Sequence, residues 1–157
     1  MLTPRFEVAH KDDLPGILNI WEQGLRHSFP DCEITNDLRS RFAFNFQCAC
    51  SPFGFWVARS KSIVAWSSLL PAFSHPLKYG TEAEISVYVD PPDANKGVGT
   101  QILRFTLETV SSTSIECVWG FARSDNLSSI RMCQNAGMKI CGVTSRKTVL
   151  LFESGEC

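Results

Sequence analysis

The segment from Asn95 to Thr100, with the sequence NKGVGT, has the composition of a phosphate-binding turn. It follows a β-rich segment, EISVYV, and precedes an amphipathic helical pattern. Gly97 and Gly99 allow positive φ angles and a close approach of the backbone to a ligand. The start of the next helix offers free N–H groups and a positive dipole, and Lys96 and Thr100 add a charge and a hydroxyl. The segment therefore predicts a phosphate or pyrophosphate site.

This turn differs from the two best-known nucleotide-binding loops. It lacks the spacing between its glycines and a following Gly-Lys that defines a Walker loop. It also lacks the third glycine and the opening βαβ unit of the dinucleotide fingerprint. The segment is therefore interpreted as a short pyrophosphate-binding turn. The alternative interpretation is that the two glycines only begin a helix and bind nothing.

The order of the expected elements places the turn in a mixed α/β sheet. Alternating residues predict strands, and apolar residues three and four apart predict helices. The helix caps are expected at Asp12 or Asp13, at Thr35 or Asn36, and at Asn126, with Gly137 ending the last helix. The order β-α-α-β-β-β-α-β-α-β-β follows, with strands at 6–10, 53–59, 62–70, 84–89, 115–121, 140–143 and 148–152, and helices at about 14–25, 36–49, 97–111 and 126–136.

Length and composition favour one folded domain over residues 1–157. The chain is 44% hydrophobic and 20% charged, which is ordinary for a globular protein. Its net charge of -1 argues against binding nucleic acid through bulk electrostatics. Mainly apolar runs such as 62–72 reach about half of the roughly 20 residues that cross a bilayer. The first residues lack a secretory pattern, so we expect a cytoplasmic protein without a membrane span.

The seven cysteines are interpreted as reduced thiols. Their number is odd, and a chain of this length can fold on its core without disulfides. Cys48 and Cys50 are too close together for a zinc knuckle, and no second Cys or His pair has ligand spacing. We therefore expect no metal site.

Two motifs together resemble the GCN5-related N-acetyltransferase (GNAT) superfamily. The family signature Q/R-x-x-G-x-G/A corresponds here to 94–99, with Ala94 in place of the usual Gln or Arg. The family helix N-x-x-S-x-x-M-x-x-x-x-G-F/Y is similar to 126–138, from Asn126 to Gly137 and Met138. The resemblance covers nearly the whole chain. It implies the GNAT fold, an α/β fold with a mixed sheet of about seven strands and about four flanking helices.

Within that superfamily, the chain looks most like the phosphinothricin acetyltransferase branch. The residues from Phe73 through Tyr79 to the segment EISVYV are similar to that branch's pattern. The branch commonly carries arginines where this chain has Ser74 and Pro76. Phosphinothricin itself is therefore not the expected substrate, although His75 and Lys78 could partly compensate.

The resemblance implies that acetyl-CoA is the acetyl donor. The strand after Glu84 is expected to separate from its neighbour, which would free backbone groups of Val87 and Val89 for the pantetheine arm. The expected donor-binding residues are Val87, Tyr88, Val89, Asn95, Lys96, Gly97, Val98, Gly99, Thr100, Asn126 and Ser129.

The same resemblance implies that the acceptor is the primary amine of a small molecule, an amino acid or a toxic amino-acid analogue. Glu84 would take the proton of the amine, and Cys133 would either protonate the departing thiolate or be a small buried filler. The expected acceptor-site residues are Phe29, Phe73, His75, Lys78 and Tyr79. A homodimer is also implied. Two alternatives remain open. The protein could acetylate a protein or peptide, or it could be a non-catalytic acyl-CoA-binding module. Ala94 in place of the usual Gln or Arg, and Cys133 in place of the Tyr of many relatives, are consistent with the non-catalytic module.

Overall fold

A computed structural model describes residues 3–72 and 76–155. These residues form seven strands and four α-helices in the predicted order, together with two short 3-10 helices. The strands are β1 (Arg5–Val8), β2 (Gly54–Arg59), β3 (Ile63–Pro71), β4 (Glu82–Val89), β5 (Cys117–Arg123), β6 (Lys139–Val143) and β7 (Lys147–Glu153). The helices are η1 (Lys11–Asp13), α1 (Leu14–Ser28), α2 (Asn36–Cys48), η2 (Pro91–Asp93), α3 (Val98–Val110) and α4 (Leu127–Asn135). The expected mixed sheet with four flanking helices is confirmed.

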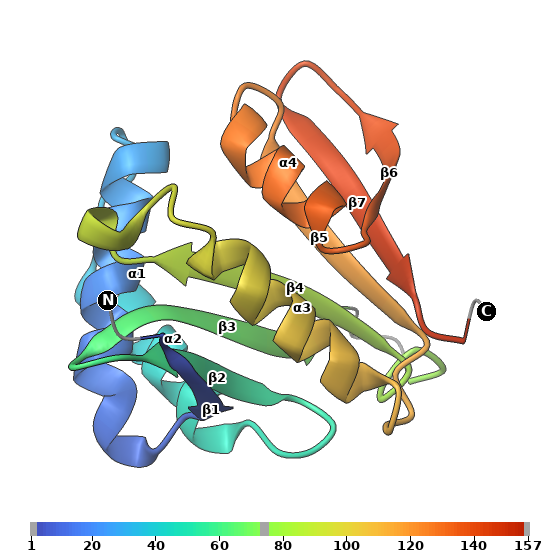
Figure 1. Ribbon diagram of the computed structural model, residues 1–157, viewed down its shortest axis with the longest axis horizontal. Helices are drawn as coiled ribbons and strands as arrows, with labels where there is room; N and C mark the ends of the chain where they lie inside the picture. The colour runs from blue at the N-terminus through green and yellow to red at the C-terminus, as the bar shows by residue number, and fades with distance from the viewer. Residues whose placement is uncertain (1–2, 73–75, 156–157) are drawn as a thin grey trace.

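All seven strands form one sheet in the order β1-β2-β3-β4-β5-β7-β6. Every neighbouring pair is antiparallel except β4 and β5, which run parallel. The parallel pairing is short, because it joins only Glu82–Glu84 of β4 to Cys117–Trp119 of β5. Beyond it the two strands diverge, and the sheet opens into two halves (Figure 1). The expected separation of β4 from its neighbour after Glu84 is therefore confirmed.

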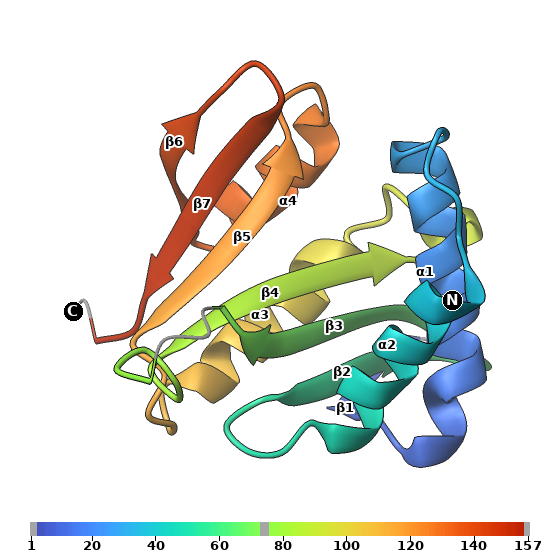
Figure 2. The same cartoon turned by 180° about the vertical axis from the view of Figure 1, so that it is seen from behind.

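Helices cover the two halves of the sheet unequally. On one side, α3 packs on β2, β3 and β4, and α4 packs on β5 and β6. On the other side, α1 and α2 lie over the β2–β4 half only (Figure 2). The β5-β7-β6 half therefore carries no helix on that side within the described part of the chain (Figure 2).

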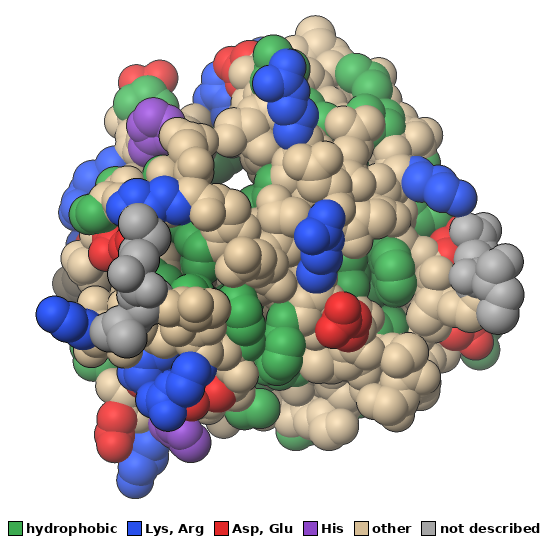
Figure 3. Space-filling view, viewed as in Figure 1, with side chains coloured by type: hydrophobic (Ala, Val, Ile, Leu, Met, Phe, Trp, Pro, Cys, Tyr) green, Lys and Arg blue, Asp and Glu red, His purple; other side chains and the backbone are tan. Residues whose placement is uncertain are grey.

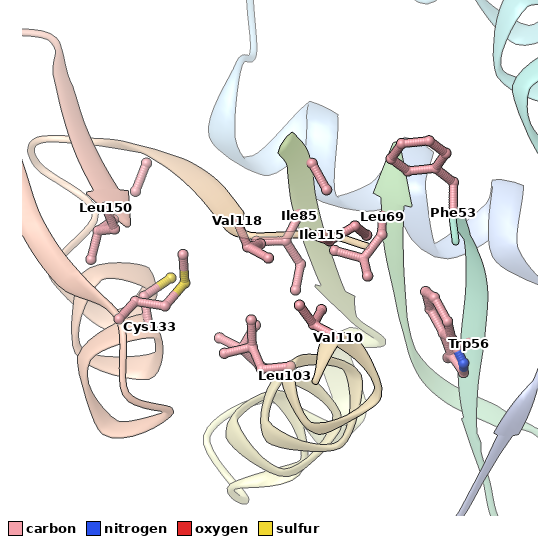
Figure 4. Packing of buried hydrophobic residues seen from close by; sticks show 14 of the residues in the cluster. Phe53, Trp56, Leu69, Ile85, Leu103, Val110, Ile115, Val118, Cys133 and Leu150 are labelled. Carbon is pink, nitrogen blue, oxygen red and sulfur yellow. The ribbon is translucent and has the colours of Figure 1, made fainter. Parts of the chain in front are cut away.

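The core lies between the sheet and its helices. Its largest cluster joins the α3 side of β2–β5 to α3, α4 and β7 (Figure 4). A second cluster joins α1 and α2 to the other face, where Trp66 is almost fully buried. No helix among the described residues is long and apolar enough to cross a membrane.

The local signals that begin and end helices account for most of the boundaries. The Thr35 hydroxyl accepts a hydrogen bond from the Leu38 N–H at 3.1 Å, as expected of an N-cap. Gly137 has a φ of +102°, which suits the residue after a helix C-terminus. Asp13 is the N-cap residue of α1, as expected, but its carboxylate binds the Arg59 guanidinium at 2.9 Å and makes no cap bond within α1.

Candidate active site

The open edge of β4 presents backbone groups without a partner strand. Hydrogen bonds from Asp90 N–H to Val64 C=O and from Ala72 N–H to Glu82 C=O, at 2.8 and 3.2 Å, show that even-numbered residues of β4 bond to β3. The backbone N–H and C=O groups of successive residues point to opposite sides of a strand. The groups of Val87 and Val89 therefore point toward β5. The β5 pairing ends at Glu84, so these groups face the opening.

The turn before α3 presents a second set of free donors. Asn95 and Gly97 have φ angles of +61° and +86°, and Gly97 is the N-cap of α3. No backbone N–H from Asn95 to Thr100 has a hydrogen-bond acceptor among the described residues. Consecutive free N–H groups at a helix N-terminus form a binding site for anions.

Gly99 has a packing role that the sequence did not predict. A Cβ atom on Gly99 would lie 2.7 Å from the Met132 sulfur and 3.2 Å from Val89 Cγ2. The glycine therefore allows α3 to pack close to α4 and β4, in addition to any approach of a ligand.

These elements surround one cleft of about 880 Å³ between the two halves of the sheet. Figure 3 shows the surface hollowed at this point, and the hollow continues through the molecule. The cleft brings together most of the residues that the sequence predicted, namely Phe29, Glu84, Val87, Tyr88, Val89, Asn95, Gly97, Gly99, Thr100, Asn126, Ser129 and Cys133.

Other predicted residues lie outside the lining of this cleft. Val98 is 7% exposed and packs in the core, and the Lys96 ammonium lies 3.8 Å from the Asp93 carboxylate. Lys78 and Tyr79 lie in the turn before β4, where the Tyr79 ring packs against Phe53 with centroids 5.8 Å apart. Phe73 and His75 lie outside the described residues.

Glu84 is half-buried at the narrow end of the cleft. Burial raises the pKa of its carboxyl group above the ordinary value. The Glu84 carboxylate has no hydrogen-bond or ion-pair partner within the described part of the chain. A carboxylate with a raised pKa and free oxygen atoms is suited to accept a proton.

Tyr88 contributes a wall of the cleft rather than a free polar group. Its ring stacks on Trp66 with centroids 5.0 Å apart, and it lies so close to Gly24 of α1 that a Cβ there would be 2.5 Å from the ring. Its backbone groups face β3. Burial raises the pKa of its hydroxyl.

Two residues of the α4 motif have clear structural roles. The Asn126 carboxamide oxygen accepts a hydrogen bond from the Ser129 N–H at 3.1 Å, which confirms the expected helix cap. Cys133 is 7% exposed and lies in the same buried cluster as Leu103 and Leu150 (Figure 4). Burial raises the pKa of its thiol to about 11, so the thiol is protonated at neutral pH.

Sequence reasoning missed the residues that α1 and β5 contribute to the cleft. They include His27 and Ser28 of α1, and Phe121 and Arg123 of β5. The Arg123 guanidinium donates a hydrogen bond to the Ser28 C=O at 2.8 Å, which joins the two elements. The alternation of residues along the predicted strand could have placed Phe121 on the same face of the sheet as Glu84. No residue near Arg123 in the sequence indicated that its guanidinium would bind the Ser28 C=O.

Comparisons with known proteins agree with this fold. The model of the Acetyltransferase (GNAT) family matches residues 14–138. No curated protein matches the chain. Within the described residues, no group of three or more His, Cys, Asp or Glu side chains could hold a metal ion.

Several solved structures share the fold at low sequence identity. A phosphinothricin acetyltransferase from Sinorhizobium meliloti, in complex with acetyl-CoA, has a TM-score of 0.85 and 16% identity, over 99% of this chain and 90% of that one. A ribosomal-protein-alanine N-acetyltransferase from Brucella melitensis has a TM-score of 0.81 and 18% identity, over 95% and 99%. An N-acetyltransferase from Staphylococcus aureus Mu50 has a TM-score of 0.79 and 18% identity, over 97% and 99%.

Proposed function

Since the chain belongs to the acetyltransferase (GNAT) family, we propose that it transfers the acetyl group of acetyl-CoA to the primary amine of a small molecule. The observation that carries this proposal is the opening between β4 and β5, where free groups of Val87 and Val89 face the same cleft as the free N–H groups before α3. Together they can bind an extended amide chain that ends in a diphosphate.

The donor site fits acetyl-CoA in its chemistry. The N–H groups from Asn95 to Thr100 and the positive end of α3 suit a diphosphate. The N–H and C=O groups of Val87 and Val89 suit the amide groups of pantetheine, because they can act as a short strand edge. Asn126 and Ser129 line the same cleft, although Asn126 already accepts the cap bond. When bound, acetyl-CoA supplies a thioester that an amine can attack.

Glu84 is the proposed general base. An ammonium group must lose its proton before its nitrogen can attack a carbonyl carbon. The Glu84 carboxylate has no other partner among the described residues and can accept that proton directly or through water. The neutral amine then attacks the thioester carbonyl, a C–N bond forms and the C–S bond breaks. The nitrogen loses its second proton as the amide forms, and this proton balances the CoA thiolate that is released as the thiol.

Direct attack is favoured over a covalent acetyl-cysteine. Cys133 would have to be a thiolate to attack the thioester, and burial, which raises its pKa to about 11, keeps it protonated. A protonated Cys133 can serve as proton donor to the departing thiolate or can simply fill space in the core.

A contact between the two halves of the sheet supports the proposal of a small acceptor. The hydrogen bond from Arg123 to the Ser28 C=O, at 2.8 Å, joins β5 to the end of α1. The Arg123 guanidinium also lies 5.7 Å from the centre of the Phe29 ring. These contacts bridge the two halves of the sheet beside the cleft and narrow the room for an extended peptide, which supports the proposal of a small acceptor.

Two measurements together test this proposal. Calorimetry should show binding of acetyl-CoA, and a screen of amines should show acetyl-CoA-dependent release of free thiol. Binding with no thiol release, unaffected by Glu84→Gln, would instead favour the non-catalytic module. Acetylation of peptides but not of small amines, seen by intact mass, would favour the protein acetyltransferase.

The homodimer and the cytoplasmic location stay predictions from the sequence. Light scattering of the full chain measures the first, and fractionation of cells measures the second.

A further inference from the structure

Arg123 and Glu84 lie on the same side of the sheet. Ile85 belongs to the core cluster beneath α3, and neighbouring residues of a strand face opposite ways, so Glu84 faces the side that carries α1. Glu84 pairs with Trp119 of β5, and Arg123 follows Trp119 by two full alternations of the strand. The Arg123 side chain therefore lies on the side from which an amine would reach Glu84.

The Arg123 guanidinium joins the two halves of the sheet at the wide end of the opening between β4 and β5, the end away from Glu84. Arg123 is the last residue of β5 and Ser28 is the last residue of α1, and the two elements finish at the same end of the molecule (Figure 2). Arg123 Nη1 donates to the Ser28 C=O at 2.8 Å, and the guanidinium carbon lies 5.7 Å from the centre of the Phe29 ring. All three residues line the cleft, so this bridge forms part of its wall.

Two features hold the guanidinium in this position. The last C=O groups of a helix have no partner within the helix and carry the negative end of its dipole, so a cation beside the Ser28 C=O is favourable. Arg123 Nε and Nη2 donate to the two Asp125 carboxylate oxygens at 3.0 and 2.8 Å. Such a fork fixes the orientation of a guanidinium. The bridge is therefore built from three groups that suit one another.

The position of the bridge sets a length for the opening. A strand rises by about 3.3 Å per residue, so Arg123 lies about 13 Å along β5 from Trp119, the partner of Glu84. Glu84 is at one end of this distance and the bridge is at the other. An acceptor whose amine lies beside Glu84 can extend along the opening by about this length, that of about four extended peptide residues, before it meets the bridge.

We infer that Arg123 is a specificity-determining residue, whose bridge to the end of α1 closes the wide end of the opening and restricts the acceptor to amines that fit between the bridge and Glu84. This inference rests on the proposed acetyltransferase function. Without the Arg123 side chain, the opening continues past the end of β5, and a longer amine can lie along it.

The ratio of activity toward long and short acceptors tests the inference. A hexapeptide is about 20 Å long when extended, which exceeds the distance from Glu84 to the bridge. Thiol release with acetyl-CoA is measured for a pool of hexapeptides and a panel of small amines, on the parent and on Arg123→Ala. The ratio of kcat/KM for the best hexapeptide to that for the best small amine should rise about tenfold or more in the variant. A general loss of activity cancels in this ratio.

Arg104→Ala is the matched control. The Arg104 guanidinium donates to the Asn135 C=O at 3.2 and 2.6 Å, and Asn135 is the last residue of α4. Arg104 is thus also an arginine at a helix C-terminus, but it is not among the described residues that line the cleft. Its ratio should equal that of the parent. An unchanged ratio in Arg123→Ala, or an equal rise in Arg104→Ala, would overturn the inference.

Hydrogen exchange tests the bridge itself without any acceptor. Phe29 N–H donates to the Leu25 C=O at 2.7 Å at the end of α1. Arg123→Ala should speed amide exchange over residues 26–29 several-fold, because the helix end loses its distant partner, and Arg104→Ala should not. Unchanged exchange in Arg123→Ala would overturn the bridge, whatever the acceptor is.

These results separate a wrong specificity from a wrong function. A parent that acetylates hexapeptides as efficiently as small amines overturns the role of Arg123 and keeps the acetyltransferase. Binding of acetyl-CoA with no thiol release for any amine or peptide overturns both.

Discussion

Glu84 is the last residue of β4 that pairs with β5, opposite Trp119, and the two strands separate directly after it. The candidate base therefore lies at the narrow end of the opening, where the free backbone groups of β4 begin. This relationship places proton acceptance next to the groups that would bind the acetyl donor. It explains how one short strand can serve both the donor and the acceptor.

Removing the carboxylate of Glu84 should slow acetyl transfer far more than it weakens binding of acetyl-CoA. Glu84→Gln is expected to lower kcat at pH 7 by about 10²–10⁴-fold, the usual cost of losing a general base. Steady-state kinetics and calorimetry on the same preparation measure the two effects. Thermal unfolding checks the fold, and the melting temperature should not fall, because the variant no longer buries a charge.

The pH dependence follows from the raised pKa of Glu84. The carboxylate accepts a proton only above its pKa, so the rate should fall as pH decreases, and at a higher pH than for an ordinary glutamate. The loss caused by Glu84→Gln should shrink at high pH, where more of the amine is already neutral. An equal loss at pH 7 and pH 9.5 would mean that Glu84 positions groups and takes no proton.

The anion site before α3 should respond to a reversal of charge. Lys96→Glu places a negative charge beside the free N–H groups and next to Asp93, so we expect acetyl-CoA to bind about tenfold more weakly at low salt. Lys61→Glu is the control, because Lys61 lies exposed in the turn between β2 and β3. Calorimetry measures the affinity of both variants for acetyl-CoA. Equal affinities would contradict the assignment of the diphosphate-binding site to this turn.

Gly99 should prove essential for stability as well as for binding. Gly99→Ala is expected to lower the free energy of unfolding by about 1–3 kcal/mol, because the added Cβ would lie 2.7 Å from the Met132 sulfur. Gly142→Ala is a control in β6, where the added Cβ would lie 4.0 Å from Val149 Cβ, an ordinary contact. Denaturant unfolding compares them, and equal stabilities would contradict the close packing of α3 on α4.

Cys133 should be dispensable for chemistry. Thiolates leave readily from thioesters, since thiol pKa values lie near 8.5. Cys133→Ala should therefore keep turnover within about tenfold of the parent, a barrier change of ~1.4 kcal/mol. Mass spectrometry after incubation with acetyl-CoA alone should find no acetyl group on the peptide that contains Cys133. An adduct that forms as fast as turnover would contradict direct attack.

Local patterns predicted the features that depend on neighbouring residues. The Thr35 and Asn126 caps and the order of strands and helices follow from residue type and periodicity. The separation of β4 from β5 came from the family resemblance and is confirmed by the short pairing. The caps and the order of the elements depend on residues close together in the sequence, whereas the pairing of β4 with β5 joins segments far apart in it.

Contacts between distant segments could not be predicted in this way. The packing role of Gly99 depends on Met132 in another helix. The hydrogen bond of the Arg123 guanidinium depends on the Ser28 C=O at the end of α1. Tyr79 was expected beside the acceptor, but it packs on Phe53, which comes from the start of β2. Such contacts are set by how the elements pack in three dimensions, and no periodic pattern encodes them.

Two-substrate kinetics test the central claim most directly, namely that the acetyl group passes straight from acetyl-CoA to an amine in the cleft between β4 and β5. Initial rates of thiol release are measured while acetyl-CoA and an accepted amine are varied together. Direct transfer requires both substrates to be bound at once, so double-reciprocal lines should intersect. Parallel lines, which indicate a covalent acetyl-enzyme, would contradict the account, as would the absence of thiol release with every amine.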